Sequence, residues 1–211
     1  MSPPADQGGS SRPALEAFFS RDGADGKELT ERLLGAFPSV NDALAAASGR
    51  LANVIGDEPA RRLREFQNLA EAVLAERVAA RPWVSIEQIA EFLNFKIGYS
   101  PVELFYAFYF DPGGCLIDSE SVAQGTANST QVSARDLIVR AVEFGSSSLL
   151  VAHNHPSGVA RPSVIDLEFT SKIDRMAEDF EMRLIDHLIV ARGKACSIRR
   201  NALISLEQRQ R

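Results

Sequence analysis

Residues 147–166 read SSLLVAHNHPSGVARPSVID, and this stretch is the most informative in the chain. Its first part, the apolar run at 147–152, predicts a short strand that leads into His153 and His155. Because alternate side chains of a strand lie on one face, the two imidazoles should point the same way. Two imidazoles on one face are suited to holding a metal ion between them.

The second part of the stretch predicts a loop and a helix. Pro-Ser-Gly at 156–158 breaks the strand, and Ser163 precedes apolar residues at helical spacing, which places Asp166 in the first turn of a helix. The strand end and the helix start would then bring together two nitrogen ligands and one oxygen ligand, with a fourth position left for water. That arrangement is typical of catalytic zinc, whereas structural zinc usually has a closed shell of protein ligands.

Simpler explanations exist for the same residues. Ser163 followed three residues later by Asp166 also forms a capping box, which starts a helix without any metal. Histidines two residues apart are often structural, with their rings satisfied by backbone partners. The chain has only three histidines, however, and two lie here, where one metal ion would satisfy both rings and the carboxylate. The combination favours a metal site.

The spacing of these residues resembles a known signature. His-x-His, then seven residues, Ser, two residues and Asp is similar to the JAMM motif of MPN metallohydrolases, and AHNHPSG at 152–158 resembles their bacterial RadC branch more closely. A supporting match is LIDHLIV at 184–190, and the resemblance covers about residues 97–200. It implies an α/β (α+β) fold of the MPN/JAMM, cytidine-deaminase-like type, in which helices flank a mixed sheet.

The resemblance also implies a role for each residue. His153, His155 and Asp166 would bind zinc, and Ser163 would be catalytic by stabilising a developing oxyanion. Zinc lowers the pKa of a bound water from about 16 towards about 7 and polarises a carbonyl. The implied activity is that of a zinc-dependent, metalloprotease-like hydrolase, in which metal-activated water attacks an amide or isopeptide bond of a peptide or isopeptide substrate.

Such a reaction needs a carboxylate that takes a proton from water and returns it to the leaving amine. Glu103 opens the strand-like run at 104–110, a context that resembles the position of the catalytic acid in MPN enzymes. Glu120, in the next predicted strand, is the alternative base. For either glutamate the plain interpretation is a solvated charge at a strand end.

The third histidine, His187, lies between Asp186 and an apolar run. We interpret it as a hydrogen-bonded histidine at the start of a strand rather than as a metal ligand. A role for His187 or Asp186 in orienting a ligand stays open.

The C-terminal part, residues 101–211, has a mixed pattern and is predicted to be the metal domain. The run at 104–110 is apolar at nearly every position, which predicts a central strand buried on both faces. The predicted strands are 103–110, 115–123, 147–153, 184–190 and 195–199, and the predicted helices are 133–144 and 163–180.

The N-terminal part has a different composition. Residues 1–12 are small, polar and turn-rich, which predicts a disordered tail. Residues 13–80 are rich in alanine, leucine, arginine and glutamate at helical spacing and predict a small all-helical domain. Ser85 and Gln88 form a capping box for a short linking helix within a linker at 81–100.

The position of this helical domain resembles the helix-hairpin-helix segment of RadC proteins, a family linked to DNA repair. Such hairpins bind DNA phosphates through backbone amides. Here the turn at 54–59 has one glycine where the family pattern has two, and its two acidic residues would repel a phosphate. Arg61, Arg62 and Arg64 follow and offer the alternative function, a DNA-repair or recombination accessory protein that binds nucleic acid. The plain interpretation of these arginines is a solvated helix face.

Composition sets further limits. The formal net charge of −5 gives no general basic surface for nucleic acid. Two cysteines, Cys115 and Cys196, neither form a disulfide framework nor show metal spacing, which favours a reducing compartment. No apolar run approaches the roughly 20 residues of a membrane span, and the N-terminus lacks a signal-peptide core. We therefore expect a cytoplasmic protein without membrane contact.

Overall fold

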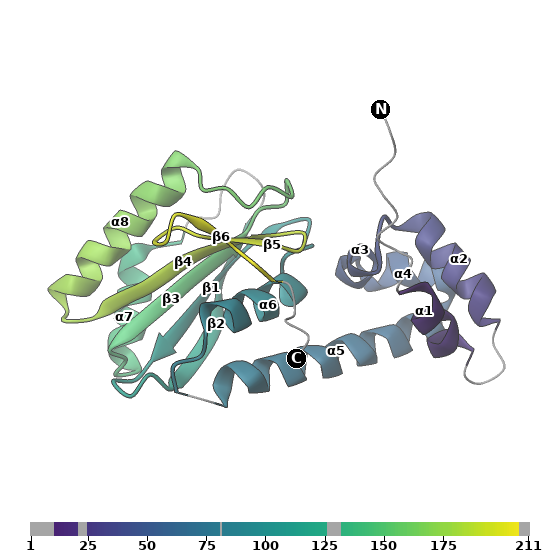
Figure 1. Cartoon of the computed structure of the whole chain (residues 1–211), viewed down its shortest axis with the longest axis horizontal. Coiled ribbons are helices and arrows are strands. Elements are labelled where there is room, and N and C mark those ends of the chain that lie inside the picture. Colours follow the sequence, from purple (N-terminus) through teal and green to yellow (C-terminus); the bar gives the residue numbers. More distant parts are fainter. Residues whose placement is uncertain (1–10, 21–24, 81, 126–131, 207–211) are drawn as a thin grey trace. The chain divides into compact units, whose positions relative to one another are not determined.

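The computed structural model describes residues 11–20, 25–80, 82–125 and 132–206. By its internal contacts the chain divides into two units, Met1–Ala70 and Glu71–Arg211. The division falls inside helix α5 (Asp57–Ala79). The first unit is helical, and the second contains the whole sheet (Figure 1).

The first unit consists of short helices that bury apolar side chains between them. They are α1 (Arg12–Phe19), α2 (Gly26–Ala36), α3 (Val40–Ala45), α4 (Ser48–Ile55) and the first part of α5. Two of them begin at side-chain caps, because the Asp25 carboxylate accepts the N–H of Glu28 and the Ser39 hydroxyl accepts that of Asp42. Gly56 ends α4 with a φ of +88°, a conformation that favours glycine. The buried residues include Phe19, Leu33, Leu51, Ile55 and Leu63.

The second unit is built on a six-stranded mixed sheet with the strand order β2-β1-β3-β4-β5-β6. The strands are β1 (Glu103–Phe110), β2 (Leu116–Gly125), β3 (Ser148–Asn154), β4 (Arg183–Ala191), β5 (Lys194–Ser197) and β6 (Ala202–Ile204). Of the described strands, β3 and β4 pair in parallel and the other neighbours pair antiparallel. A parallel pair needs a crossover, and helix α8 (Val164–Asp179) provides it.

Helices cover both faces of this sheet (Figure 1). Helix α6 (Ile86–Lys96) packs on one face, where Phe92 and Leu93 share a buried cluster with Phe108, Leu150 and Leu188. Helix α7 (Ala134–Glu143) and α8 pack on the other face. The cluster there includes Ala107, Tyr109, Leu137, Val151 and Ile173. The predicted α/β (α+β) class is confirmed, and β1 is the central, doubly covered strand that its apolar run predicted.

The structure differs from the sequence-based prediction in the role of one helix and in one additional strand. The linking helix exists as α6, with the capping box of Ser85 and Gln88 in place, but its apolar side chains belong to the core of the sheet domain. Strand β6 was not predicted, because it is three residues long and follows a turn in which Asn201 has a φ of +47°.

The predicted disordered tail falls mainly on residues outside the described part of the chain. Of that segment, Arg12 already begins α1. Among the described helices, none combines the length and apolarity that crossing a membrane requires.

Candidate metal centre

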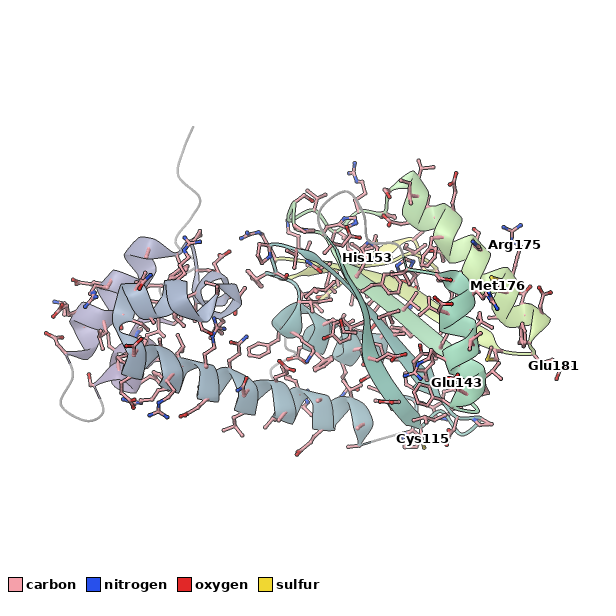
Figure 2. All side chains as sticks on the ribbon, turned by 180° about the vertical axis from the view of Figure 1, so that it is seen from behind. Cys115, Glu143, His153, Arg175, Met176 and Glu181 are labelled. Atoms are coloured by element: carbon pink, nitrogen blue, oxygen red, sulfur yellow. The ribbon has the colours of Figure 1, made fainter. Side chains whose placement is uncertain are left out.

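The two histidines of the AHNHPSG motif lie where β3 ends. His153 is 1% exposed within the strand, and Figure 2 shows it inside the sheet domain, whereas Arg175 of α8 points outwards. His155 follows the strand, and its backbone N–H donates to the Val190 carbonyl of β4 at 3.0 Å. The ring centroids of the two histidines lie 4.8 Å apart, so the imidazoles share a face as predicted.

The loop after His155 fixes the orientation of its ring. It turns at Gly158, whose φ is +80° and where an added Cβ would lie 2.9 Å from Cδ of Arg192, so the position favours glycine. Beyond the turn, the Val159 carbonyl lies 2.9 Å from Nδ1 of His155. A carbonyl can only accept a hydrogen bond, so Nδ1 carries a proton, and in the neutral ring Nε2 keeps its lone pair.

The start of α8 holds Asp166. The Ser163 hydroxyl accepts the N–H of Asp166 at 3.2 Å, and Oδ2 of Asp166 accepts the N–H of Ser163 at 2.6 Å. The capping box is therefore present. It leaves Oδ1 of Asp166 facing His153, so the cap and a metal site do not exclude each other.

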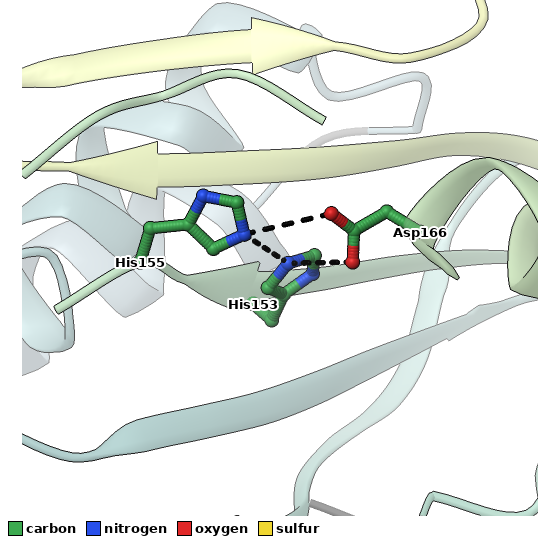
Figure 3. Close-up of side chains that lie close together, drawn as sticks. All are labelled: His153, His155 and Asp166. Atoms are coloured by element: carbon green, nitrogen blue, oxygen red, sulfur yellow. Dashed lines mark hydrogen bonds and ion pairs between the residues drawn. The ribbon is translucent and has the colours of Figure 1, made fainter. Parts of the chain in front are cut away.

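The ligand-type atoms of His153, His155 and Asp166 converge on one point (Figure 3). Nε2 of His153 lies 2.9 Å from Nε2 of His155 and 3.3 Å from Oδ1 of Asp166, and Nε2 of His155 lies 3.6 Å from Oδ2. Ligands about 2.0–2.2 Å from a tetrahedral zinc ion are about 3.3–3.6 Å from one another. The two distances to Asp166 match this range, and the 2.9 Å between the imidazole nitrogens is shorter. Two imidazoles and a carboxylate are a donor set that fits zinc, with a fourth position left for a small ligand.

These groups also set one another's charge. Burial alone would raise the pKa of Asp166, but its interactions with the nearby imidazoles of His153 and His155 outweigh burial and hold this pKa well below its ordinary range. The pKa of His155 is raised, chiefly by its hydrogen bond to Asp166 and against the effect of burial. Asp166 is therefore ionised at neutral pH and offers a charged oxygen ligand.

Glu103 begins β1, the strand next to β3. Phe105 pairs with His153, so the antiparallel register brings the start of β1 alongside the end of β3. Glu103 is half-buried, and its charge contributes to the raised pKa of His155. Within the described part of the chain its carboxylate has no hydrogen bond or ion pair. A carboxylate whose charge acts on His155, and which has no competing partner among the described residues, is suited to act as a base.

Asn154 ties the segment that carries Glu103 to β3. Its Oδ1 accepts the N–H of Leu104 at 2.8 Å, and its Nδ2 donates to the carbonyls of Ser100 and Val102 at 3.3 and 3.0 Å. The side chain is completely buried. Asn154 was not predicted to matter, although its place between two histidines of a strand puts it on the opposite face, towards a neighbouring segment.

Glu120, the alternative base, has other partners. On β2 it pairs with Ala107 of β1, and its carboxylate accepts hydrogen bonds from Tyr109 at 3.0 Å and Arg140 at 2.9 Å. The hydrogen bond from Arg140 lowers the pKa of Glu120. Because a carboxylate engaged by a guanidinium is a weak proton acceptor, the geometry favours Glu103.

His187 lies in the middle of β4 and not, as was predicted, at the start of a strand. It contacts His153, one of the three candidate metal ligands. Its Nε2 lies 2.9 Å from Nδ1 of His153, and its Nδ1 lies 2.6 Å from Oγ1 of Thr170. Burial holds the pKa of His187 well below its ordinary value, so the ring is neutral. Asp186 instead accepts the hydroxyl of Ser197 and contacts none of the three metal-type side chains in the described residues. Thr170 was not predicted; the available signal was its spacing of one helical turn from Asp166.

The three arginines predicted to bind nucleic acid are engaged inside the helical unit. Arg61 forms ion pairs with two glutamates one helical turn away on either side. Arg62 donates to the Phe18 carbonyl at 3.0 Å, and Arg64 donates to two backbone carbonyls at the end of α3. Nucleic-acid binding through these arginines stays a prediction.

Neither cysteine belongs to the metal centre. Cys115 is an exposed free thiol in the turn between β1 and β2, at the other end of β1 from Glu103 (Figure 2). Cys196 is a free thiol on β5, and burial raises its pKa.

Comparison with known proteins connects this fold and site to a family. Residues 83–203 match the RadC-like JAB domain. The chain belongs to the RadC-like JAB domain family. A UPF0758 protein of Rhodobacter capsulatus is 33% identical to this RadC-like chain over 183 residues, which cover 85% of this chain and 86% of that protein. A UPF0758 protein of Chromobacterium violaceum is 34% identical over 86% of this chain and 84% of its own length.

The RadC-like JAB domain contains every residue of the metal centre, from Glu103 to His187. Membership therefore confirms the resemblance stated from the AHNHPSG motif and establishes a JAMM/MPN-type domain. The names of the relatives identify the family and state no activity.

Proposed function

We propose that this RadC-like protein is a zinc-dependent hydrolase that cleaves an amide or isopeptide bond. The observation that carries the proposal is the convergence of two imidazole nitrogens and an ionised carboxylate, with 2.9–3.6 Å between neighbouring atoms. Three protein ligands of mixed nitrogen and oxygen type, with a fourth position left open, are typical of catalytic zinc.

A bound zinc ion would supply Lewis acidity and make water acidic enough to lose a proton near neutral pH. Glu103 would take that proton and return it to the leaving amine, since its carboxylate is half-buried beside His155 and has no competing partner in the described residues. Ser163 would donate its hydroxyl proton to the carbonyl oxygen of the substrate. Its Oγ accepts the N–H of Asp166, which leaves the hydroxyl proton free for this bond.

A groove lined by the loop that joins His155 to Ser163 supports a peptide or isopeptide as substrate. It has a volume of about 410 Å³, and its wall includes residues 158–162, which belong to the loop between His155 and Ser163. Leu203 and Lys194 line the groove as well. A surface with both apolar and cationic groups suits an extended chain that carries carbonyl and acidic groups.

Zinc content is the first test. Protein purified without added metal would be examined by elemental analysis as wild type, His153→Ala and Asp166→Asn, with Asp179→Asn at the exposed end of the same helix as the matched control. We expect near-stoichiometric zinc in the wild type and the control, and its loss in the other two variants. Folded wild-type protein without zinc, even after incubation with zinc, would contradict the proposal.

A further inference from the structure

A row of hydrogen bonds between buried side chains starts at the ring nitrogen of His153 that points away from His155 and Asp166. It runs from Nδ1 of His153 to Nε2 of His187 at 2.9 Å, and from Nδ1 of His187 to Oγ1 of Thr170 at 2.6 Å. The Thr170 hydroxyl continues to the backbone carbonyl of Asp166 at 2.6 Å. The row therefore begins at one metal-type residue and ends at another, and all of its side chains are buried.

The end of the row fixes the direction of every bond in it. The Asp166 carbonyl can only accept, so the single hydroxyl proton of Thr170 points at that carbonyl. Oγ1 of Thr170 must then accept, which puts a proton on Nδ1 of His187. His187 is 1% exposed and its ring nitrogens contact His153 and Thr170 rather than a carboxylate, so the ring carries no second proton. Nε2 of His187 is left as an acceptor, so the proton of His153 lies on Nδ1. Nε2 of His153, the atom that faces His155 and Asp166, keeps its lone pair.

We propose that His187 and Thr170 form a positioning relay that holds His153 in the tautomer with a bare Nε2, ready to bind the metal. The inference rests on the proposed zinc site. In this role His187 and Thr170 act through His153 and contact neither the metal nor the substrate. Hydrogen-bonded partners of this kind orient metal-binding histidines and commonly affect affinity by about 10–100-fold.

The surroundings of the relay make it hard to replace. Phe105 stacks on His153 with an interplanar angle of 4°, and its ring centroid lies 5.7 Å from that of His187. Phe169 lies against His187 from another side, with 6.5 Å between centroids. In this apolar enclosure a lost hydrogen bond leaves a buried polar group unsatisfied.

Two substitutions at one position separate the relay from packing. Thr170→Val keeps the size of the side chain but removes the acceptor for His187, whereas Thr170→Ser restores the hydroxyl. Competition with a chromophoric chelator should show zinc bound about 10–100-fold more weakly by Thr170→Val and with near wild-type affinity by Thr170→Ser. Ile173→Val, on the same buried face of α8, controls for packing, because it should lower stability and leave zinc affinity unchanged.

Imidazole tautomers give a second readout that packing alone would not change. Long-range ¹H–¹⁵N correlation spectra should show His187 protonated on Nδ1, and His153 protonated on Nδ1 in the zinc-loaded protein. Wild-type zinc affinity in Thr170→Val, or a proton on Nε2 of His187, would overturn the relay. If the wild type bound no zinc, the proposed function would fail, and the tautomer of His187 would still decide the direction of the row.

Discussion

The metal centre of the sheet domain and the arginines of the helical unit were both predicted from residue type, and they differ in what their polar groups already contact. In the metal centre, the far side of each ring is satisfied, by the Val159 carbonyl for His155 and by His187 for His153. The near sides, together with the carboxylate of Asp166, face one another. These nitrogen and oxygen atoms converge on one point, where they could bind a metal ion.

The arginines of the helical unit show the opposite state. Arg61 is surrounded by glutamates, and Arg64 is directed at backbone carbonyls of its own unit. The terminal guanidinium nitrogens of Arg64 and the guanidinium of Arg61 therefore already have partners within the unit, although Nε of Arg64 has none among the described residues. A binding site is therefore better recognised by polar atoms that converge on one point and lack other partners than by the presence of charged residue types alone.

The largest expected effect is a loss of catalytic rate, and it tests Glu103 as the general base of the proposed metal centre. Glu103→Gln should retain zinc and lose about 10²–10⁴-fold in kcat on a cleaved peptide, because the proton acceptor is gone. Glu120→Gln is the matched control and should keep the activity, since Glu120 is engaged by Arg140. Full activity of Glu103→Gln alongside an inactive Glu120→Gln would reverse the assignment.

The second expected effect is a loss of stability, and it tests the hydrogen bonds by which Asn154 holds the Glu103 segment against β3. Asn154→Ala removes three hydrogen bonds of a completely buried side chain and should destabilise the sheet domain by about 2–4 kcal/mol. Urea unfolding would measure this loss against Ser119→Ala, an exposed change on β2. Equal stability of the two variants would mean that the tie between β3 and the Glu103 segment contributes nothing.

Much of the fold was predictable because its signals are local. The apolar run of β1 and the apolar run before His153 are long enough to predict strands, and capping boxes mark the starts of α6 and α8. Strand β6 was missed because three residues carry no usable period.

Residue spacing predicted the part of the candidate site whose residues are close in the sequence, whereas Glu103 was predicted from the family resemblance. His153, His155, Ser163 and Asp166 lie within one continuous stretch. The contact between His153 and His187 depends on the parallel register of β3 and β4, in which Val151 pairs with His187, and no local pattern contains that register. Thr170 was missed for a related reason, since its hydroxyl contacts His187 only once α8 is packed beside β4.

A smaller effect tests the arginines as structural groups. Arg64→Ala should destabilise the helical unit by about 1–3 kcal/mol, because it leaves part-buried carbonyls without donors. Arg61→Ala should unfold at the same denaturant concentration as the wild type, because its ion pairs are exposed. Unchanged stability of Arg64→Ala would show that its guanidinium is available to an outside partner.

The smallest expected effect is on nucleic acid. Duplex DNA measured by fluorescence anisotropy should bind no more tightly than a non-specific ligand, with Kd of about 10⁻⁴–10⁻⁶ M at physiological salt. Replacing Arg61, Arg62 and Arg64 by alanine should change this little. A tighter affinity that falls steeply with salt and is lost in the triple variant would establish the accessory DNA-binding function instead.

The double use of the Asp166 carboxylate has a consequence for how the protein would be handled and assayed. Oδ2 closes the first turn of α8 and lies 3.6 Å from Nε2 of His155, and Oδ1 lies 3.3 Å from Nε2 of His153. Zinc binding at the proposed site would therefore be thermodynamically linked to order at the start of this helix. Amide hydrogen exchange in that turn would report occupancy without any substrate, and a chelating buffer would loosen a piece of backbone as well as remove an ion.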